Sequence, residues 1–234
     1  MIEIYPLASG STGNCYRVTD GSNPLLLECG IRFREIQRGI GYRVSDIAGC
    51  FVSHSHGDHS KAAADMMKAG VDVYMSQGTA DALGLTGHRL KIVRALEQFK
   101  IGAWTVLPFD TVHDAQNPLG FLLVHKAGAR VLFLTDTAYC KYRFNKLTHI
   151  LIEANYSLDI LNANVAAGAV PVAHKVRVMR SHMSLETAKE FLAANDLSRV
   201  QEIWLLHLSD QNSDAERFRR VVMAATGKPV FVAG

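Results

Sequence analysis

The segment from Cys50 to His59 reads Cys-Phe-Val-Ser-His-Ser-His-Gly-Asp-His. Its apolar start predicts a short buried strand, and the polar half follows where that strand ends, just before a helical pattern. His54, His56, Asp58 and His59 place three imidazoles and one carboxylate within six residues. Neutral imidazole and carboxylate are good ligands for zinc and similar divalent ions. A solvated histidine-rich loop is the alternative, but this composition and spacing favour a metal site.

The spacing inside this segment also bears on the number of ions. His54 and His56 alternate, so in an extended chain both side chains project to the same side. Asp58 and His59 then turn toward a second position. Because further histidines follow later in the chain, a single tetrahedral ion would have more ligands than it needs. The pattern therefore favours two metal ions.

The composition is that of an ordinary soluble globular protein. The chain has 234 residues, of which 48% are hydrophobic and 20% charged, which excludes collagen-like, low-complexity and intrinsically disordered classes. A chain of this length can bury one large core, and with no linker or repeat we expect one domain over residues 1–234. The net charge of +3 permits a polyanionic partner without requiring one.

Cysteine usage and hydropathy indicate the compartment. Cys15, Cys29, Cys50 and Cys140 show no C-x-x-C spacing, which predicts reduced thiols rather than a zinc ribbon or a disulfide framework. The N-terminus lacks the apolar stretch of a secretory signal, and no apolar run reaches the roughly 18 residues that span a bilayer. We therefore expect a soluble, cytoplasmic protein.

Short β-type runs dominate the first half of the chain, and helical patterns become more frequent later. Ser184 is the expected N-cap of one late helix, with Glu186 in its first turn. This order predicts an α/β chain in which sheets pack together with helices outside. The expected strands are 2–7, 15–19, 25–28, 49–52, 71–74, 103–108, 120–126, 130–135, 202–207 and 229–232, and the expected helices are 60–69, 78–83, 158–166, 184–195 and 214–226.

Three further candidate ligands lie at the ends of expected strands. His113 follows the strand that ends at residue 108, Asp136 follows the one that ends at 135, and His207 closes a late strand. A sheet would present such strand ends at one edge. Each residue alone is a weak signal, but the order of all of them along the chain is a strong one.

In this order the residues resemble the H-x-H-x-D-H, His, Asp, His series of the metallo-β-lactamase superfamily. The resemblance implies a four-layer αββα sandwich with the site at one edge between its halves. It implies two divalent ions, Zn²⁺ or Mn²⁺, since His/Asp sites accept both. The implied ligands are His54, His56 and His113 for the first ion, Asp58, His59 and His207 for the second, and Asp136 as the bridge.

Within the superfamily the chain resembles the YycJ/WalJ-type nuclease-like metallohydrolases, which are related to tRNase Z-like phosphodiesterases. The resemblance covers most of the chain and includes Ser-Gly-Ser-Thr-Gly-Asn at residues 9–14. The chain departs from the group at Glu28, where Asp is common, at Ala138, where Gly is common, and at residues 155–157, where Asn-Tyr-Ser replaces Asn-His-Asp. The last of these departures lies near the expected catalytic rim and bears on substrate preference more than on chemistry.

The resemblance also implies catalytic residues beyond the ligands. His182 would donate a proton to the leaving oxygen, and Glu153 would orient it. A neighbouring carboxylate raises the pKa of an imidazole and keeps it protonated near neutrality. The alternatives are a helix-start histidine without a role and a strand-end salt bridge. Together with Asp58, His182 and Glu153 are the expected catalytic residues.

Two other features bear on phosphate binding. The glycine-rich loop 9–14 can direct backbone amides at phosphate or simply reverse a β-hairpin, and both interpretations stay open. Six basic residues lie between Lys141 and Arg180, interleaved with aromatic ones, against only two acids, Glu153 and Asp159. Flanking the candidate site, they favour a track for a phosphate backbone. His88, His125, His149, His174 and Cys140 match no motif and are expected to be structural or surface residues.

Together these observations predict a di-metal phosphodiesterase that acts on nucleic acid, DNA rather than RNA, as an exonuclease-like enzyme using a metal-bridging hydroxide. The alternatives are an RNA-processing enzyme and a small-molecule hydrolase of esters, thioesters or lactams on the same fold. A non-catalytic binding module would be expected to have lost ligands, and none is missing.

Overall fold

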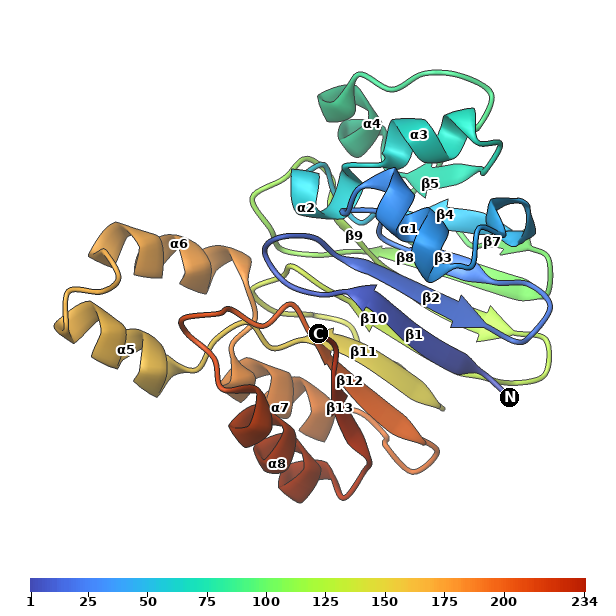
Figure 1. Cartoon of the computed structure of the whole chain (residues 1–234). Helices are drawn as coiled ribbons and strands as arrows, with labels where there is room; N and C mark the ends of the chain where they lie inside the picture. The colour runs from blue at the N-terminus through green and yellow to red at the C-terminus, as the bar shows by residue number, and fades with distance from the viewer. The chain divides into compact units, whose positions relative to one another are not determined.

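The computed structural model describes residues 1–234 and divides into two compact units (Figure 1). The first unit comprises Met1–Asp110, Ala115–Gly128 and Gly234, and the second comprises Thr111–Asp114 and Ala129–Ala233. One domain over residues 1–234 therefore stays a prediction. No helix is both long enough and apolar enough to cross a membrane.

The first unit contains a six-stranded sheet whose strands follow one another in chain order. β1 to β3 pair antiparallel, and β3 to β6 pair parallel. Because β3 and β4 run parallel, the residues that follow them, Glu28 and the segment beginning at Val52, leave the sheet at the same edge. The strands are β1 (Glu3–Ala8), β2 (Cys15–Thr19), β3 (Leu25–Leu27), β4 (Gly49–Phe51), β5 (Val73–Met75) and β6 (Leu90–Ile92).

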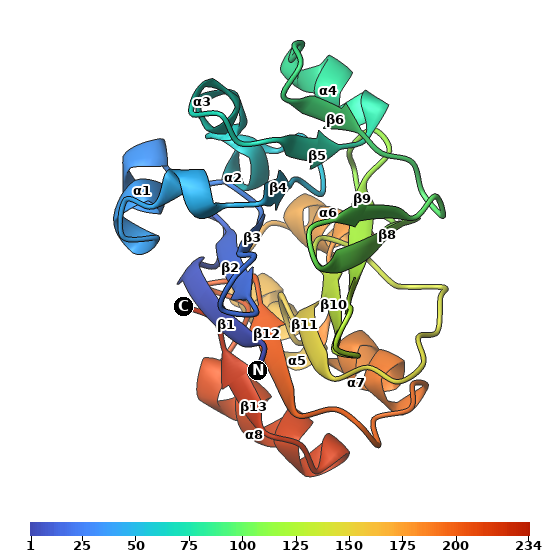
Figure 2. The same ribbon diagram turned by 90° about the vertical axis from the view of Figure 1, so that its right-hand side faces the viewer.

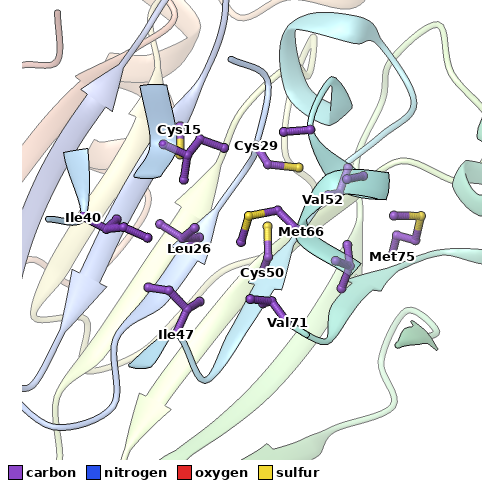
Figure 3. Packing of buried hydrophobic residues seen from close by; sticks show 14 of the residues in the cluster. Cys15, Leu26, Cys29, Ile40, Ile47, Cys50, Val52, Met66, Val71 and Met75 are labelled. Carbon is purple, nitrogen blue, oxygen red and sulfur yellow. The ribbon is translucent and has the colours of Figure 1, made fainter. Parts of the chain in front are cut away.

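Helices α1 (Phe33–Gly39), α2 (Gly57–Ser60), α3 (Ala63–Lys68) and α4 (Gln77–Leu83) and a 3₁₀ turn (Val44–Asp46) accompany this sheet. Side chains of α1 and α3 pack on it to form a core, and Figure 3 shows Met66 with Cys29 and Cys50 in its middle. All three are fully buried, and burying a side chain such as Met66 contributes about 1.5–3 kcal/mol. The thiols are free, as expected from their spacing.

The expected helix 60–69 begins later in the structure, as α3, and only its first residue belongs to the preceding short helix α2. α2 ends at Ser60 and α3 begins at Ala63, and between them the N–H of Ala62 donates to the carbonyl of Cys29 at 2.9 Å. A tertiary hydrogen bond thus replaces the helical one and breaks the pattern that the sequence alone suggests. The remaining strands of the first unit, β7 (Phe99–Ile101), β8 (Trp104–Asp110) and β9 (Leu119–His125), pair antiparallel in succession.

The second unit is built on four parallel strands, β10 (Arg130–Leu134), β11 (His149–Glu153), β12 (Glu202–Leu206) and β13 (Val230–Val232). Their carboxyl ends share one edge, and Asp136, Glu153 and His207 lie there. Helix α8 (Ala215–Thr226) packs beside β13, and α7 (Leu185–Ala193) packs against α8 (Figure 1). Figure 2 shows α8 beside β13 from a second side. Ser184 is the N-cap of α7, as predicted, and accepts a hydrogen bond from the N–H of Thr187 at 3.1 Å.

Two further helices, α5 (Leu158–Ala166) and α6 (Val172–Ser181), connect the end of β11 to His182. Figure 1 shows them as a pair set apart from α7 and α8. Leu161 and Val178 hold the pair together in a small core of its own. The sequence predicted α5 with its observed bounds but did not predict α6, nor α1, β6, β7 and β11.

Candidate metal centre

The first unit gathers four of the predicted ligands on the loop that follows β4 and on α2. Nε2 of His54 lies 3.1 Å from Nδ1 of His56, and the rings of His54 and His59 have centroids 4.2 Å apart. Nε2 of His59 lies 3.4 Å from a carboxylate oxygen of Asp58. The contiguous motif therefore presents its donors as one contacting group, which we call the loop donor set (His54, His56, Asp58 and His59).

His59 is held on both sides of its ring. Nδ1 lies 3.6 Å from the carboxylate of Glu28, and Nε2 lies 3.2 Å from the side-chain amide nitrogen of Asn14. Glu28 is itself fixed because its two oxygens accept from the N–H of Ser53 at 3.2 Å. Burial raises the pKa of Glu28. A carboxylate at Nδ1 orients a histidine so that Nε2 carries the lone pair that a metal ion needs.

The backbone locks this loop against the glycine-rich segment. The N–H of Asn14 donates to the carbonyl of Asp58 at 2.7 Å, and the N–H of Cys29 donates to that of His59 at 2.9 Å. Gly30 is required at this crossing, because a Cβ there would collide with the Asp58 carbonyl. The loop 9–14 connects β1 to β2, which fits the hairpin interpretation, and it also braces the ligands.

The second unit gathers the remaining predicted residues around Asp136. Its carboxylate lies 3.5 Å from Nε2 of His113, 3.7 Å from Nε2 of His207 and 3.9 Å from Nδ1 of His182. Ligand atoms of Asp136, Glu153, His182 and His207 all lie within 4.8 Å of one another. We call Asp136, His113 and His207 the strand-end donor set.

Strand-end geometry is unusual at three of the site residues. Glu28, Asp136 and His207 have φ values of 63°, 41° and 53°. This left-handed region is uncommon for residues other than glycine; Asp and His adopt it more readily than most, and Glu28 is the least favoured of the three. Strain of this kind persists where the surrounding structure fixes it and is concentrated at functional sites. Here it turns each side chain sharply at the point where its strand ends.

Glu153 is fully buried and accepts three hydrogen bonds. One oxygen accepts from the N–H groups of Thr137 and Met183, each at 3.0 Å, and the other lies 2.6 Å from Nδ1 of His182. Burial lowers the pKa of His182, but the charge of Glu153 and the hydrogen bond to it outweigh burial and raise the pKa to about 9. The predicted contact between Glu153 and His182 is therefore present, and it keeps His182 protonated at neutral pH.

His113 and His207 each have a fixed ring. Nδ1 of His113 lies 2.6 Å from the carbonyl oxygen of Ser181, which can only accept, so Nδ1 carries the proton and Nε2 the lone pair. Burial lowers the pKa of His113 and favours its neutral, ligand-competent form. Asn155 donates to the backbone carbonyl of His207 at 2.8 Å and lies 3.1 Å from its Nδ1. These donors suit a divalent metal ion.

A family model described as the beta-lactamase superfamily domain matches residues 24–208, which include every predicted ligand. The chain belongs to the metallo-β-lactamase superfamily. Membership and the His/Asp donors make it a metal-dependent hydrolase.

Relatives and solved structures agree with this assignment. The chain is 28% identical over 227 residues to "Exodeoxyribonuclease WalJ" of Streptococcus pneumoniae, covering 90% of this chain and 82% of the relative. It is 26% identical over 243 residues to "Exodeoxyribonuclease YycJ" of Bacillus anthracis, covering 97% and 90%. The crystal structure of the metallo-β-lactamase fold protein YhfI of Bacillus subtilis superposes with a TM-score of 0.76 at 15% identity, covering 99% of this chain and 96% of that one. The predicted fold class, a metallo-β-lactamase-type α/β sandwich, is confirmed.

Besides Glu28, three residues of this metallo-β-lactamase site escaped prediction as positioning groups. Asn14 braces His59, Asn155 braces His207, and Ser181 orients His113. Ser181 acts through its backbone carbonyl, so no side-chain pattern could reveal it. The two asparagines were visible in the sequence, but only the fold brings them against the ligands.

The residues that match no superfamily motif have ordinary partners or lie elsewhere. Nε2 of His125 lies 2.9 Å from the Asp20 carboxylate, and Nδ1 of His149 lies 2.8 Å from the hydroxyl of Thr148. The thiol of Cys140 donates weakly to the carbonyl of Tyr142. These contacts fit the structural roles that were expected.

Proposed function

We propose that the chain is a di-metal phosphodiesterase that acts on nucleic acid, most simply a DNA exonuclease. The observation that carries this proposal is the contact between Glu153 and His182 beside Asp136. Cleavage of a phosphodiester expels an alkoxide, which needs a proton as it leaves. A thiolate leaving group, as in thioester hydrolysis, leaves without that help, so a positioned protonated histidine favours the phosphodiester over the thioester.

The metal ligands in this proposal are those of the two donor sets. In this assignment, His54, His56 and His113 would hold one ion, Asp58, His59 and His207 would hold the other, and Asp136 would be shared by both. The surroundings of the donors support this assignment, because Glu28 and Ser181 each face Nδ1 of a ligand histidine and leave its Nε2 for a metal ion. When bound, Zn²⁺ or Mn²⁺ ions lower the pKa of water and neutralise charge on phosphate oxygens.

His182 has the task of moving a proton. Nδ1 is engaged with Glu153, so Nε2 is the nitrogen that can donate to the leaving oxygen. Its side chain is partly exposed and therefore accessible to substrate. The N–H bond of Nε2 breaks as an O–H bond forms on the departing nucleotide, and the neutral imidazole then regains its proton from water. Glu153 stays an acceptor throughout, since two backbone N–H groups hold its other oxygen.

The choice of nucleic acid as substrate rests on similarity and charge. Relatives that share 26–28% of their residues with the chain are named exodeoxyribonucleases. The net charge of +3 is compatible with a polyanion. An RNA-processing phosphodiesterase would use the same donors and the same acid, and it is the second candidate.

The test uses end-labelled single-stranded DNA, double-stranded DNA and RNA of the same sequence, with the protein loaded with Zn²⁺ or Mn²⁺. An exonuclease that prefers DNA releases mononucleotides from the labelled end and leaves RNA largely intact. Preferential cleavage of RNA would replace DNA by RNA in the proposal. Turnover of thioester or lactam substrates, with no cleavage of any nucleic acid, would overturn it.

A further inference from the structure

A groove of about 350 Å³ lies in the second unit, beside the strand-end donor set. One wall is the turn 112–114, which carries His113, and the other is helix α6 with Arg177 and Arg180. The groove therefore reaches a proposed metal ligand directly. Its volume is at the lower end of those that hold a small-molecule ligand, which fits one nucleotide of a single strand better than a duplex.

The charge of the α6 wall is unbalanced. Helix α6 contains Lys175, Arg177 and Arg180 and no acidic residue. Lys175 donates to the side-chain oxygen of Asn162 in α5, and Asp159, the acidic residue of α5, pairs with Arg217 at 2.7 Å. The ion pairs of this unit do not include Arg177 or Arg180, and both side chains are exposed.

The groove also has one carboxylate and two exposed apolar side chains. A carboxylate oxygen of Asp114 lies 3.2 Å from Nε2 of His113, so this acid faces the donor set. Val112 and Val176 are 38% and 43% exposed. Exposed aliphatic side chains beside two guanidinium groups suit a ligand with alternating apolar rings and anionic groups, which is the pattern of a nucleic-acid strand.

We propose that this groove binds the strand next to the scissile phosphodiester, with Arg177 and Arg180 contacting its phosphates. The inference rests on the proposed function and adds the residues that bind the rest of the substrate. Residues three apart on a helix lie on one face, with Cβ atoms about 5–6 Å apart, so both guanidinium groups face the same strand. Each can donate two parallel hydrogen bonds to a phosphate.

Helix α6 also supports a metal ligand, so the experiment must separate its effect on that ligand from its contacts with phosphate. Helix α6 ends at Ser181, whose carbonyl orients His113. A substitution on α6 could therefore act by disturbing a metal ligand instead of by removing a hydrogen bond to phosphate. A substrate with a single phosphodiester and no flanking phosphates, such as bis(p-nitrophenyl) phosphate, reports only the first effect.

The variants are Arg177→Gln, Arg180→Gln and the double variant, with Arg199→Gln as a matched control. Arg199 is also an exposed arginine of this unit, but it precedes the amino end of β12, away from the strand ends that carry the donors. The binding probe is a fluorescein-labelled, single-stranded phosphorothioate oligodeoxynucleotide, with metal-loaded protein and fluorescence anisotropy as the readout. Removal of each charge-assisted hydrogen-bonding group should raise Kd about tenfold.

Salt dependence gives an independent measure. For a single strand, each phosphate that the protein no longer neutralises should reduce the slope of log Kd against log salt concentration by about 0.7. We expect that reduction in Arg177→Gln and in Arg180→Gln, roughly twice that in the double variant, and none in Arg199→Gln. Hydrolysis of bis(p-nitrophenyl) phosphate should stay unchanged in all of them.

The outcomes separate this inference from the proposed function. Wild-type affinity and salt slope in the double variant would overturn the groove assignment. A decrease in hydrolysis of bis(p-nitrophenyl) phosphate as large as the decrease in affinity for the oligonucleotide would also overturn it, because it would show that α6 positions His113. A wild-type protein that does not bind the oligonucleotide would overturn it as well. A protein that binds the strand through these arginines but hydrolyses no phosphodiester would support the groove and remove the proposed function.

Discussion

The two units present their metal donors in different ways. In the first unit, four donors lie within six residues of one loop, and backbone hydrogen bonds from Asn14 and Cys29 hold that loop. In the second, His113, Asp136 and His207 are separated by many residues and meet because they follow strands. The first set is a local motif, and the second is a product of the fold.

The units also differ in how charge is arranged around the donors. Next to the loop donor set, Glu28 accepts from one backbone N–H and faces His59. Next to the strand-end set, Glu153 accepts from two backbone N–H groups and holds a partly exposed histidine, His182. A buried carboxylate that points at a ligand is suited to orientation, and one that points at an accessible imidazole is suited to acid catalysis.

The largest effect is expected at Asp136, the residue that the proposal shares between both ions. Asp136→Ala should reduce activity to that of metal-free protein and lower the metal content, while the fold is retained. Phosphodiesterase assays measure the activity, elemental analysis measures the metal content, and circular dichroism checks the fold. Asp20→Asn is the matched control, since Asp20 is also a carboxylate paired with a histidine but lies outside both donor sets. Full activity in Asp136→Ala would contradict the bridging role.

The second effect concerns the proton donor, which has no counterpart in the loop donor set. His182→Ala should lower the rate constant on nucleic acid by roughly 10²–10⁴-fold, the range of positioned acid catalysis. The decrease should be smaller on bis(p-nitrophenyl) phosphate, whose leaving group needs little protonation. Both ions should remain bound. His174→Ala, on α6 and without an assigned role, should behave as wild type.

Two results would remove His182 from this role. Release of a metal ion in His182→Ala would make it a ligand, which its distance of 3.9 Å from Asp136 allows. An equal decrease on both substrates would make it a positioning residue. Glu153→Gln distinguishes proton donation by His182 from positioning, because it removes the charge that holds His182 protonated but preserves most of the shape of the Glu153 side chain.

The contrast between the units explains what the sequence could predict. The loop donors were predictable because their spacing alone places them together. Asp136 and His207 were predictable because parallel strands end at one edge of a sheet. Helix α6 was not, since three valines lower its helical propensity. The break between α2 and α3 depends on the bond from Ala62 to Cys29, which no local pattern encodes.

The third prediction compares the acid sensitivity of the two units. Burial lowers the pKa of His149, in the second unit, from 6.5 to about 4. Between these values the unfolded chain binds a proton that the native chain does not, so stability falls as the pH falls through that window. The stabilisation that this shift contributes is at most about 3 kcal/mol, because solvent screening reduces it. It is fully present above pH 6.5 and lost near pH 4.

In the first unit, Asp20 also loses its stabilisation on acidification, but in a lower pH window. Burial raises its pKa, but hydrogen bonds from the N–H groups of Asn23 and Ser22 and from His125 outweigh burial and lower the pKa to about 2. Its stabilisation is lost only as the pH falls below 3.8. Urea unfolding of metal-free protein should therefore show a smaller drop in stability from pH 6.5 to pH 4 in His149→Phe than in wild type. In Asp20→Asn that drop should be unchanged, and an unchanged drop in His149→Phe would contradict the assignment.

The smallest effect is expected at the two asparagines that brace the donor sets. Asn14 donates to the carbonyls of Gly10 and Asp58 and lies against His59, and Asn155 donates to the carbonyl of His207. Removal of an outer group that orients a ligand typically weakens metal affinity 10–100-fold. In the proposed assignment, Asp58, His59 and His207 hold the same ion. Asn14→Ala and Asn155→Ala should therefore weaken the same one of two binding steps, although they lie in different units.

Competition with a chromophoric chelator resolves the two steps, and Asn195→Ala is the matched control. Asn195 is also a buried asparagine with filled hydrogen bonds, to the N–H of Phe144 and the carbonyl of Phe191, but it touches no proposed ligand. Its replacement should cost stability without changing either affinity. If Asn14→Ala weakens one step and Asn155→Ala the other, the ligands are divided by unit, with His59 and His207 on different ions. A shared step would instead mean that His59 and His207 hold the same ion, so that this ion draws ligands from both the local motif and the strand ends.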